Sequence, residues 1–183
     1  TTISQALGAG LERRARRYAA LIAGLAGLTG SIIALASLLC LPLTLRLMHV
    51  SPELEPVIET FIIAYSCQLP FYYTLIMLNS VFRAYKLVRL PLIAIAVVAA
   101  SNFVGSAGFG LGLWGLPDCG YRGIAWSTFG SALLGLACNL YAIVRHGILT
   151  RSSLAPWRWA RRALPCLFRV GGPSALGALA GHM

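Results

Sequence analysis

Residues 90–117 read LPLIAIAVVAASNFVGSAGFGLGLWGLP, and the whole run contains no Asp, Glu, Lys or Arg. Three similar uncharged runs cover residues 18–45, 60–82 and 123–144. A helix needs roughly 20 apolar residues to cross the hydrocarbon core of a bilayer, so each run is long enough to span it. The backbone in lipid must pair its own polar groups, and the runs are too long and too uniformly apolar for barrel strands. The sequence therefore predicts four transmembrane helices.

The composition also indicates a membrane protein. Of the 183 residues, 58% are hydrophobic and 11% are charged, and the mean hydropathy is +0.77. Soluble domains carry about 25% charged residues, and a soluble fold this apolar would expose large aggregating patches. The five cysteines show no CxxC spacing, and the chain has no phosphate loop or pair of nucleophile and base. We therefore expect an all-α integral membrane protein that is not an enzyme and has no catalytic or metal-binding residues.

The charged residues lie between the uncharged runs and alternate in sign. On one face the loops carry 13 of the 15 basic residues, and on the other they carry Glu53, Glu55, Glu59 and Asp118 with only two arginines. By the positive-inside rule the basic face is cytoplasmic. Because the basic residues are not interleaved with stackable aromatics, we do not expect nucleic-acid binding.

These observations divide the chain into four parts. We predict a cytoplasmic loop over residues 1–17 and a four-helix transmembrane bundle over residues 18–146. A basic cytoplasmic loop follows over residues 147–169. Residues 170–183 are apolar but too short to cross a bilayer, so they are expected to begin a further, truncated helix.

Local patterns suggest where the helices begin, bend and pack. The sequence Ser51-Pro52-Glu53 offers a capping hydroxyl, a first-turn proline and a first-turn acid, so we expect the second helix to begin there. Pro42 and Pro70 fall inside uncharged runs and predict helix kinks. Gly108 and Gly112 are four residues apart and predict a face that another helix can approach closely.

Few polar side chains lie inside the predicted helices, and two places stand out. Asn102 has Ser106 one turn later on the same helix face. This pair could line a cavity or hold an ion, or it could hydrogen-bond neighbouring helices together. Gln68 precedes Pro70 and is a candidate cavity-lining residue, because broken helices often lie near the binding sites of transporters.

Several short motifs, in order along the chain, are familiar. Residues 4–10 read SQALGAG and are followed by arginines, residues 81–83 read VFR, residues 120–128 read GYRGIAWST, and residues 172–173 are Gly-Pro. Together with Asn102 and its glycine-rich continuation, they resemble the MATE family of multidrug and toxic compound extrusion transporters. The resemblance implies twelve transmembrane helices in two lobes, of which this chain would supply helices 3 to 6 and the start of helix 7.

The resemblance also implies a site and an activity. Members export organic cations and drugs in exchange for Na⁺ or H⁺, and their amino-terminal cation site combines an acid on helix 1 with polar groups on helices 5 and 6. Asn102 matches the helix 5 asparagine, Ser106 stands where an acid or amide is common, and Thr128 matches a helix 6 threonine.

The resemblance implies partners and a location as well. The implied partners are membrane lipid, a small-molecule drug or organic cation, and the missing remainder of the transporter. Na⁺ or H⁺ would be the coupling ion, with no other cofactor, and the bacterial inner membrane is the implied location.

Two other functions are open from the sequence. A lipid or oligosaccharide flippase of the same superfamily would need a wide, basic groove, but no arginine lies in the middle of a predicted helix. A non-transporting membrane scaffold would use the four helices only to assemble with a partner protein.

Overall fold

The computed structural model describes residues 2–149, and this part of the chain contains helices and no strands. A short helix, α1 (Thr2–Gly8), precedes four long ones, and a 3₁₀ turn, η1, lies between the last two. The long helices are α2 (Glu12–Leu47), α3 (Glu55–Ala84), α4 (Arg89–Leu111) and α5 (Gly120–Arg145). Each is long and apolar enough to cross a membrane, which confirms the predicted fold class. The basic loop after residue 149 and the predicted fifth helix lie outside the described residues.

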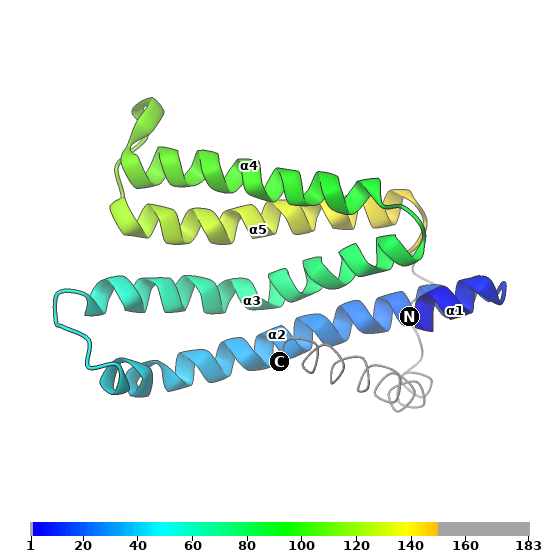
Figure 1. Ribbon diagram of the computed structural model, residues 1–183, viewed down its shortest axis with the longest axis horizontal. Helices are drawn as coiled ribbons and strands as arrows, with labels where there is room; N and C mark the ends of the chain where they lie inside the picture. Colours follow the sequence, from blue (N-terminus) through cyan, green and yellow to red (C-terminus); the bar gives the residue numbers. More distant parts are fainter. Residues whose placement is uncertain (1, 150–183) are drawn as a thin grey trace, which may run out of the picture.

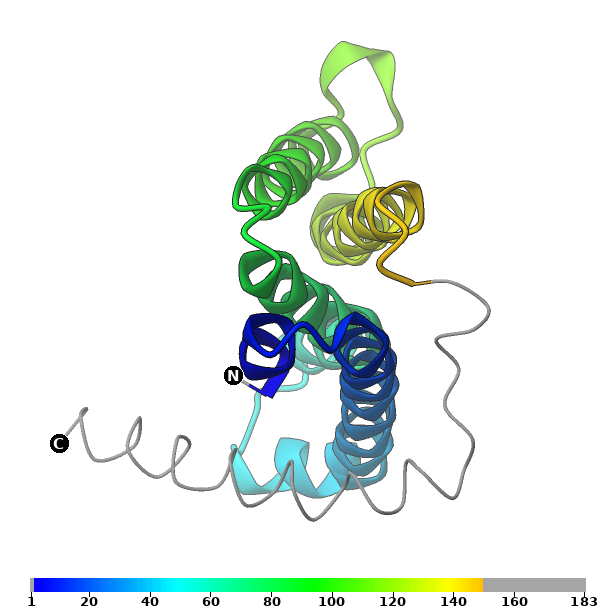
Figure 2. The ribbon, with the colours of Figure 1, turned by 90° about the vertical axis from the view of Figure 1, so that its right-hand side faces the viewer.

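The four long helices run side by side, with successive helices antiparallel (Figure 1). Helix α2 packs on α3, α4 packs on α5, and contacts between α3 and α5 join the two pairs. Helix α1 lies beside the start of α2 (Figure 2). We call the end of the bundle where α2 begins the basic end, and the opposite end the acidic end. The basic end carries Arg13, Arg14, Arg16, Arg17, Arg83, Lys86, Arg89 and Arg145; the acidic end carries Glu53, Glu55, Glu59, Asp118, Arg46 and Arg122.

The best-packed part of the bundle lies toward the basic end. Phe82, Leu78 and Ile143 are fully buried there, and the small side chains of Ala15 and Ala19 let α2 approach them. Elsewhere the helices present large apolar side chains outward, as expected for surfaces that face lipid or further protein.

Several helix ends differ from the sequence prediction, and α2 already begins at Glu12, within the stretch predicted to be a loop. Helix α3 begins at Glu55 rather than at Ser51, and no side chain caps its start. Instead, the Ser51 carbonyl accepts the backbone N–H groups of Leu54 and Glu55, so residues 52–54 form a turn. Helix α4 ends at Leu111, well before the end of the uncharged run, because Gly112 adopts a left-handed conformation with φ of 66°.

Within residues 2–149, Gly108 and Gly112 do not form the predicted face for another helix. A Cβ on Gly108 would meet the Leu116 side chain, which belongs to the segment that follows α4, and Gly112 ends the helix. Close approach to another helix occurs instead at Gly123 of α5, which lies against the backbone of Phe109 on α4.

Both prolines lie inside helices, as expected from the sequence. Pro70 cannot donate the backbone hydrogen bond of a regular helix, and Figure 1 shows α3 changing direction near the middle of its length. Gly30 of α2 faces this region, where an added Cβ would lie 2.7 Å from the Pro70 Cα. The absence of a side chain at Gly30 therefore lets α2 follow α3.

Tyr85, directly after α3, carries a buried hydroxyl that finds no hydrogen-bond partner among residues 2–149. Burial raises its pKa above the usual value, although nearby Arg16 opposes the shift. A pKa that is higher in the folded state means that this group's contribution to stability falls as the pH rises above about 10.

We expect Tyr85→Phe to increase the free energy of unfolding by about 1 kcal/mol, because it removes an unpaired buried hydroxyl. The increase in stability should be larger at pH 11 than at pH 8. At pH 11 the tyrosine ionises more readily in the unfolded wild type than in the folded one, and the variant no longer has this group. Thermal unfolding in detergent, followed by circular dichroism at both pH values, checks this. A variant less stable than the wild type at pH 8 would mean that the hydroxyl has a partner.

Candidate functional site

A cluster of polar side chains joins the middle of α4 to α5. The Asn102 amide donates hydrogen bonds to the Thr128 Oγ1 atom at 3.3 Å and to the Ser131 Oγ atom at 3.4 Å. Ser106 Oγ donates to the Asn102 Oδ1 atom at 3.1 Å and lies 2.8 Å from Ser127 Oγ. The five residues form one connected network, which we call the polar cluster.

Small residues bring the two helices close enough for these bonds. A Cβ on Gly105 would lie 2.8 Å from the Ser127 Cβ, so only glycine fits there without a shift. Ser131 is 2% exposed and the other members are partly buried. The cluster is therefore a preformed polar layer inside a predominantly apolar helix pair.

The structure brings together three of the four candidates named from the sequence. Asn102 and Ser106 share a helix face as predicted, and Thr128 contacts Asn102 directly. Ser127 and Ser131 were not singled out. Their signal was the spacing on one helix, because Ser131 lies three residues after Thr128 and four residues after Ser127.

Gln68 does not join the polar cluster. It lies on α3, and its Oε1 atom is buried with no hydrogen-bond partner among residues 2–149. A buried amide oxygen without a partner costs free energy unless another group pairs with it. Gln68 therefore stands apart from Asn102, Ser106 and Thr128 as a separate polar position.

A second buried amide pair connects α3 with α5. Asn139 donates to the Asn79 Oδ1 atom at 2.8 Å and more weakly to the Leu75 carbonyl at 3.5 Å. The two asparagines are 1% and 5% exposed. Because the pair is buried and its hydrogen bonds join α5 to α3, its role is to hold these two helices together.

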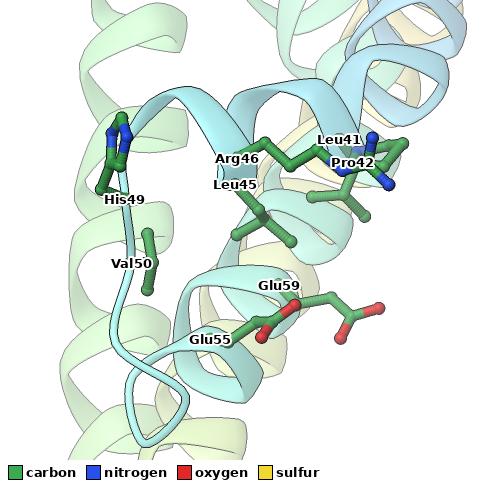
Figure 3. Close-up of a pocket in the computed structure, with 8 residues that line it drawn as sticks. All are labelled: Leu41, Pro42, Leu45, Arg46, His49, Val50, Glu55 and Glu59. Atoms are coloured by element: carbon green, nitrogen blue, oxygen red, sulfur yellow. The ribbon is translucent and has the colours of Figure 1, made fainter.

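A cavity of 660 Å³ opens at the acidic end, between the last turns of α2 and the start of α3. Figure 3 shows its lining, which comprises Leu41, Pro42, Leu45, Arg46, His49, Val50, Glu55 and Glu59. Glu55 and Glu59 lie one turn apart on α3, and neither carboxylate is within ion-pair distance of Arg46 or His49. Two carboxylates against one arginine make this cavity attractive to cations.

No sequence pattern indicates this cavity, because its acids stand out only as markers of membrane topology. Its shape depends on the loop between α2 and α3, where His49 has a φ of 47° that side-chain-bearing residues rarely adopt. Pro42, predicted only as a kink, is part of the wall.

The polar cluster offers the chemistry of oxygen ligands. Its asparagine and hydroxyl oxygens are neutral, and hard cations such as Na⁺ prefer oxygen. Within residues 2–149 there is no group of three or more His, Cys, Asp or Glu side chains that could hold a metal ion. Because the oxygens of the cluster carry no charge, they suit a weakly held monovalent cation, or a hydrogen-bonding substrate, better than a tightly bound metal.

Comparison with known proteins identifies a family for the chain. No curated protein and no solved structure matches the chain. The family model for MatE matches residues 1–107, which include α1 to α3 and the part of α4 that carries Asn102 and Ser106. Because the match covers more than half of the chain, the protein belongs to the MatE family, a family of multi-span membrane transporters.

Proposed function

We propose that the chain serves a cation-coupled multidrug efflux antiporter, which exports organic cations or drugs in exchange for Na⁺ or H⁺. The single observation that carries this proposal is the polar cluster, which lies inside an otherwise apolar helix pair in a member of a transporter family. Polar groups at such depth are costly in lipid and commonly mark the path of a solute or ion.

The Asn102 side chain is the centre of the proposed ion site. Its Oδ1 atom lies within hydrogen-bond distance of the Ser106 hydroxyl, which in turn lies within hydrogen-bond distance of the Ser127 hydroxyl. The three oxygens could therefore turn toward one small cation. The internal hydrogen bonds would then be exchanged for ion contacts. An additional acid, which the family resemblance implies on a preceding helix, would increase the affinity for cations.

The cavity at the acidic end gives the proposed substrate an attractive surface. Glu55 and Glu59 supply negative charge, while Leu41 and Leu45 supply apolar contact area. This combination suits a lipophilic organic cation. By the positive-inside rule we propose that the basic end is cytoplasmic, so that the cavity lies on the outer side of a bacterial inner membrane, where the exported compound leaves.

Transport would use alternating access, as in other two-lobed carriers. In the described part, α2 packs on α3 and α4 packs on α5, so the polar cluster lies within one helix pair rather than between the pairs. Ion binding at the cluster could therefore change the fit of α4 on α5 without unfolding either helix. We expect full transport to need the remaining helices of the transporter.

The proposal is tested by equilibrium binding of radiolabelled tetraphenylphosphonium to the chain in lipid nanodiscs. We expect saturable binding that weakens when NaCl replaces choline chloride, or when the pH is lowered, because antiported cations and substrate compete. Asn102→Leu should weaken the effect of Na⁺ or H⁺ about fivefold, equivalent to about 1 kcal/mol for one lost polar contact. Asn102→Asp should strengthen it, since a carboxylate attracts cations.

Ser101→Ala is the matched control. Ser101 neighbours Asn102 on α4, but its hydroxyl donates to the Val97 carbonyl of its own helix at 2.6 Å and takes no part in the cluster. The control should bind like the wild type. Binding that does not saturate, or that responds to cations equally in the Asn102→Leu variant and the wild type, would refute the proposed site.

A further inference from the structure

A second hollow, separate from the cavity at the acidic end, runs along the outside of α4 and α5. It has a volume of 460 Å³, and its wall includes Gly105, Phe109, Trp126, Gly130 and Leu134. Trp126 and Leu134 are about half exposed, and Trp126 is held edge-on against the Phe129 ring at 5.7 Å. We call this hollow the α4–α5 groove.

The floor of the α4–α5 groove contains serines, but their hydroxyl protons are already used. Ser101 donates to the Val97 carbonyl, Ser127 to the Ile124 carbonyl at 3.1 Å, and Ser131 to the Thr128 carbonyl at 2.8 Å. A hydroxyl that bonds back to its own helix offers little to an occupant. The floor therefore accepts an apolar occupant without leaving a donor unpaired.

The side of α5 that lines the groove carries a regular row of residues. Arg122, Trp126, Gly130 and Leu134 follow one another at intervals of four, so they lie on one face of the helix. The row begins at the acidic end and extends for about 18 Å toward the middle of the membrane, from the helical rise per residue. The row thus begins with the charged Arg122, continues with the aromatic Trp126 and with Gly130, which has no side chain, and ends with the apolar Leu134.

Arg122 is free to pair with an anion. Its side chain is exposed, its guanidinium lies 5.9 Å from the centre of the Tyr121 ring, and no carboxylate among residues 2–149 is within ion-pair distance. Asp118, one turn away in sequence, instead accepts the backbone N–H of Gly120. An arginine with free donors at the membrane surface is suited to a phosphate group.

We propose that the α4–α5 groove retains one anionic phospholipid, whose phosphate pairs with Arg122 and whose acyl chain lies past Trp126 over Gly130. Charge complementarity at Arg122 selects the lipid, and the length and apolar character of the row fit an acyl chain. The bound acyl chain covers the groove side of Ser127 and Ser131, which belong to both the groove and the polar cluster. The lipid thereby keeps the polar cluster closed toward the membrane.

Trp126 provides a direct reporter of the bound lipid. In the 183-residue chain with Trp114, Trp157 and Trp159 replaced by phenylalanine, Trp126 is the remaining tryptophan. The chain is reconstituted into vesicles containing a small fraction of brominated phosphatidylglycerol, or the same fraction of brominated phosphatidylcholine. Bromine quenches tryptophan fluorescence at short range, and we expect at least twofold stronger quenching by the anionic lipid.

Two variants separate the headgroup from the acyl chain. Arg122→Gln should remove the preference for the anionic lipid, whereas Arg46→Gln, at the other arginine of the acidic end, should preserve it. Gly130→Phe should reduce quenching by both lipids, because a side chain at Gly130 enters open space in the groove. Gly24→Phe is the control, since Gly24 of α2 also faces open space but lies outside the groove.

The proposal fails if both lipids quench Trp126 equally in the wild type, or if Gly24→Phe reduces quenching as much as Gly130→Phe does. It also fails if Trp126 becomes protected from both lipids as the protein-to-lipid ratio rises, which would assign the groove to a second copy of the chain. None of these outcomes depends on drug or cation transport, so the proposed function is tested separately.

Discussion

Gly123→Ala is expected to destabilise the helix bundle by about 2 kcal/mol, the cost of forcing an added methyl group into a well-packed contact. The new Cβ would overlap the carbonyl of Phe109 on α4 and would lie 3.0 Å from the Gly110 nitrogen. These are backbone atoms, so they cannot move aside as a side chain could. The Phe109 carbonyl also accepts the Cys119 N–H at 2.9 Å, which ties the turn between α4 and α5 to the helix end. Separating the helices would therefore strain this hydrogen bond as well.

Gly130→Ala is the matched control for this prediction. It makes the same substitution on the same helix, but the Cβ at Gly130 meets nothing within 4 Å. Alanine favours helix over glycine by up to about 1 kcal/mol, so the control should be neutral or slightly stabilising. Unfolding in mixed detergent micelles, followed by far-ultraviolet circular dichroism, gives both free energies. Equal stabilities for the two variants would show that α4 and α5 are not in close contact at Gly123.

The four long helices could be predicted from the sequence because the bilayer imposes a simple rule. A segment without charges that is long enough to cross the hydrocarbon must be helical, whatever its neighbours do. The helix ends follow weaker rules. The start of α3 at Glu55 and the end of α4 at Leu111 depend on backbone turns in the loops, and the uncharged run continues past the second of these. The absence of charge predicts which segments cross the membrane, but it does not predict the residues at which a helix begins and ends.

The polar cluster could be predicted only in part. Asn102 and Ser106 are neighbours on one helix, and spacing alone shows this. Contacts of Asn102 with Thr128 and Ser131 depend on how α4 and α5 pack, which no local spacing gives. Thr128 was identified through a family resemblance, and the two serines beside it were not. Gln68 is a candidate only because it lies two residues before Pro70, but a proline kink does not by itself direct a side chain into a site.

Asn139→Leu is expected to reduce the free energy of unfolding by about 1–2 kcal/mol. This value lies within the range for buried hydrogen bonds, and in the upper part of the range for hydrogen bonds between membrane helices. The change removes the 2.8 Å bond to Asn79 and leaves the Asn79 Oδ1 atom buried without that donor. Asn79→Leu in the same chain should restore part of the loss, because no amide then remains unpaired. The two single variants and the double variant form a thermodynamic cycle, measured by the same mixed-micelle unfolding.

Gln68→Leu is a demanding control for the asparagine pair, because it also replaces an amide inside α3 with leucine. Its Oε1 atom has no hydrogen-bond partner among residues 2–149, so its removal should leave stability unchanged or increase it. A loss for Asn139→Leu with no loss for Gln68→Leu would show that pairing, rather than polarity, holds α3 against α5. If the loss in the double variant equals the sum of the losses in the two single variants, the asparagines act independently, and the contact between α3 and α5 must depend on apolar packing around Leu75 and Leu136.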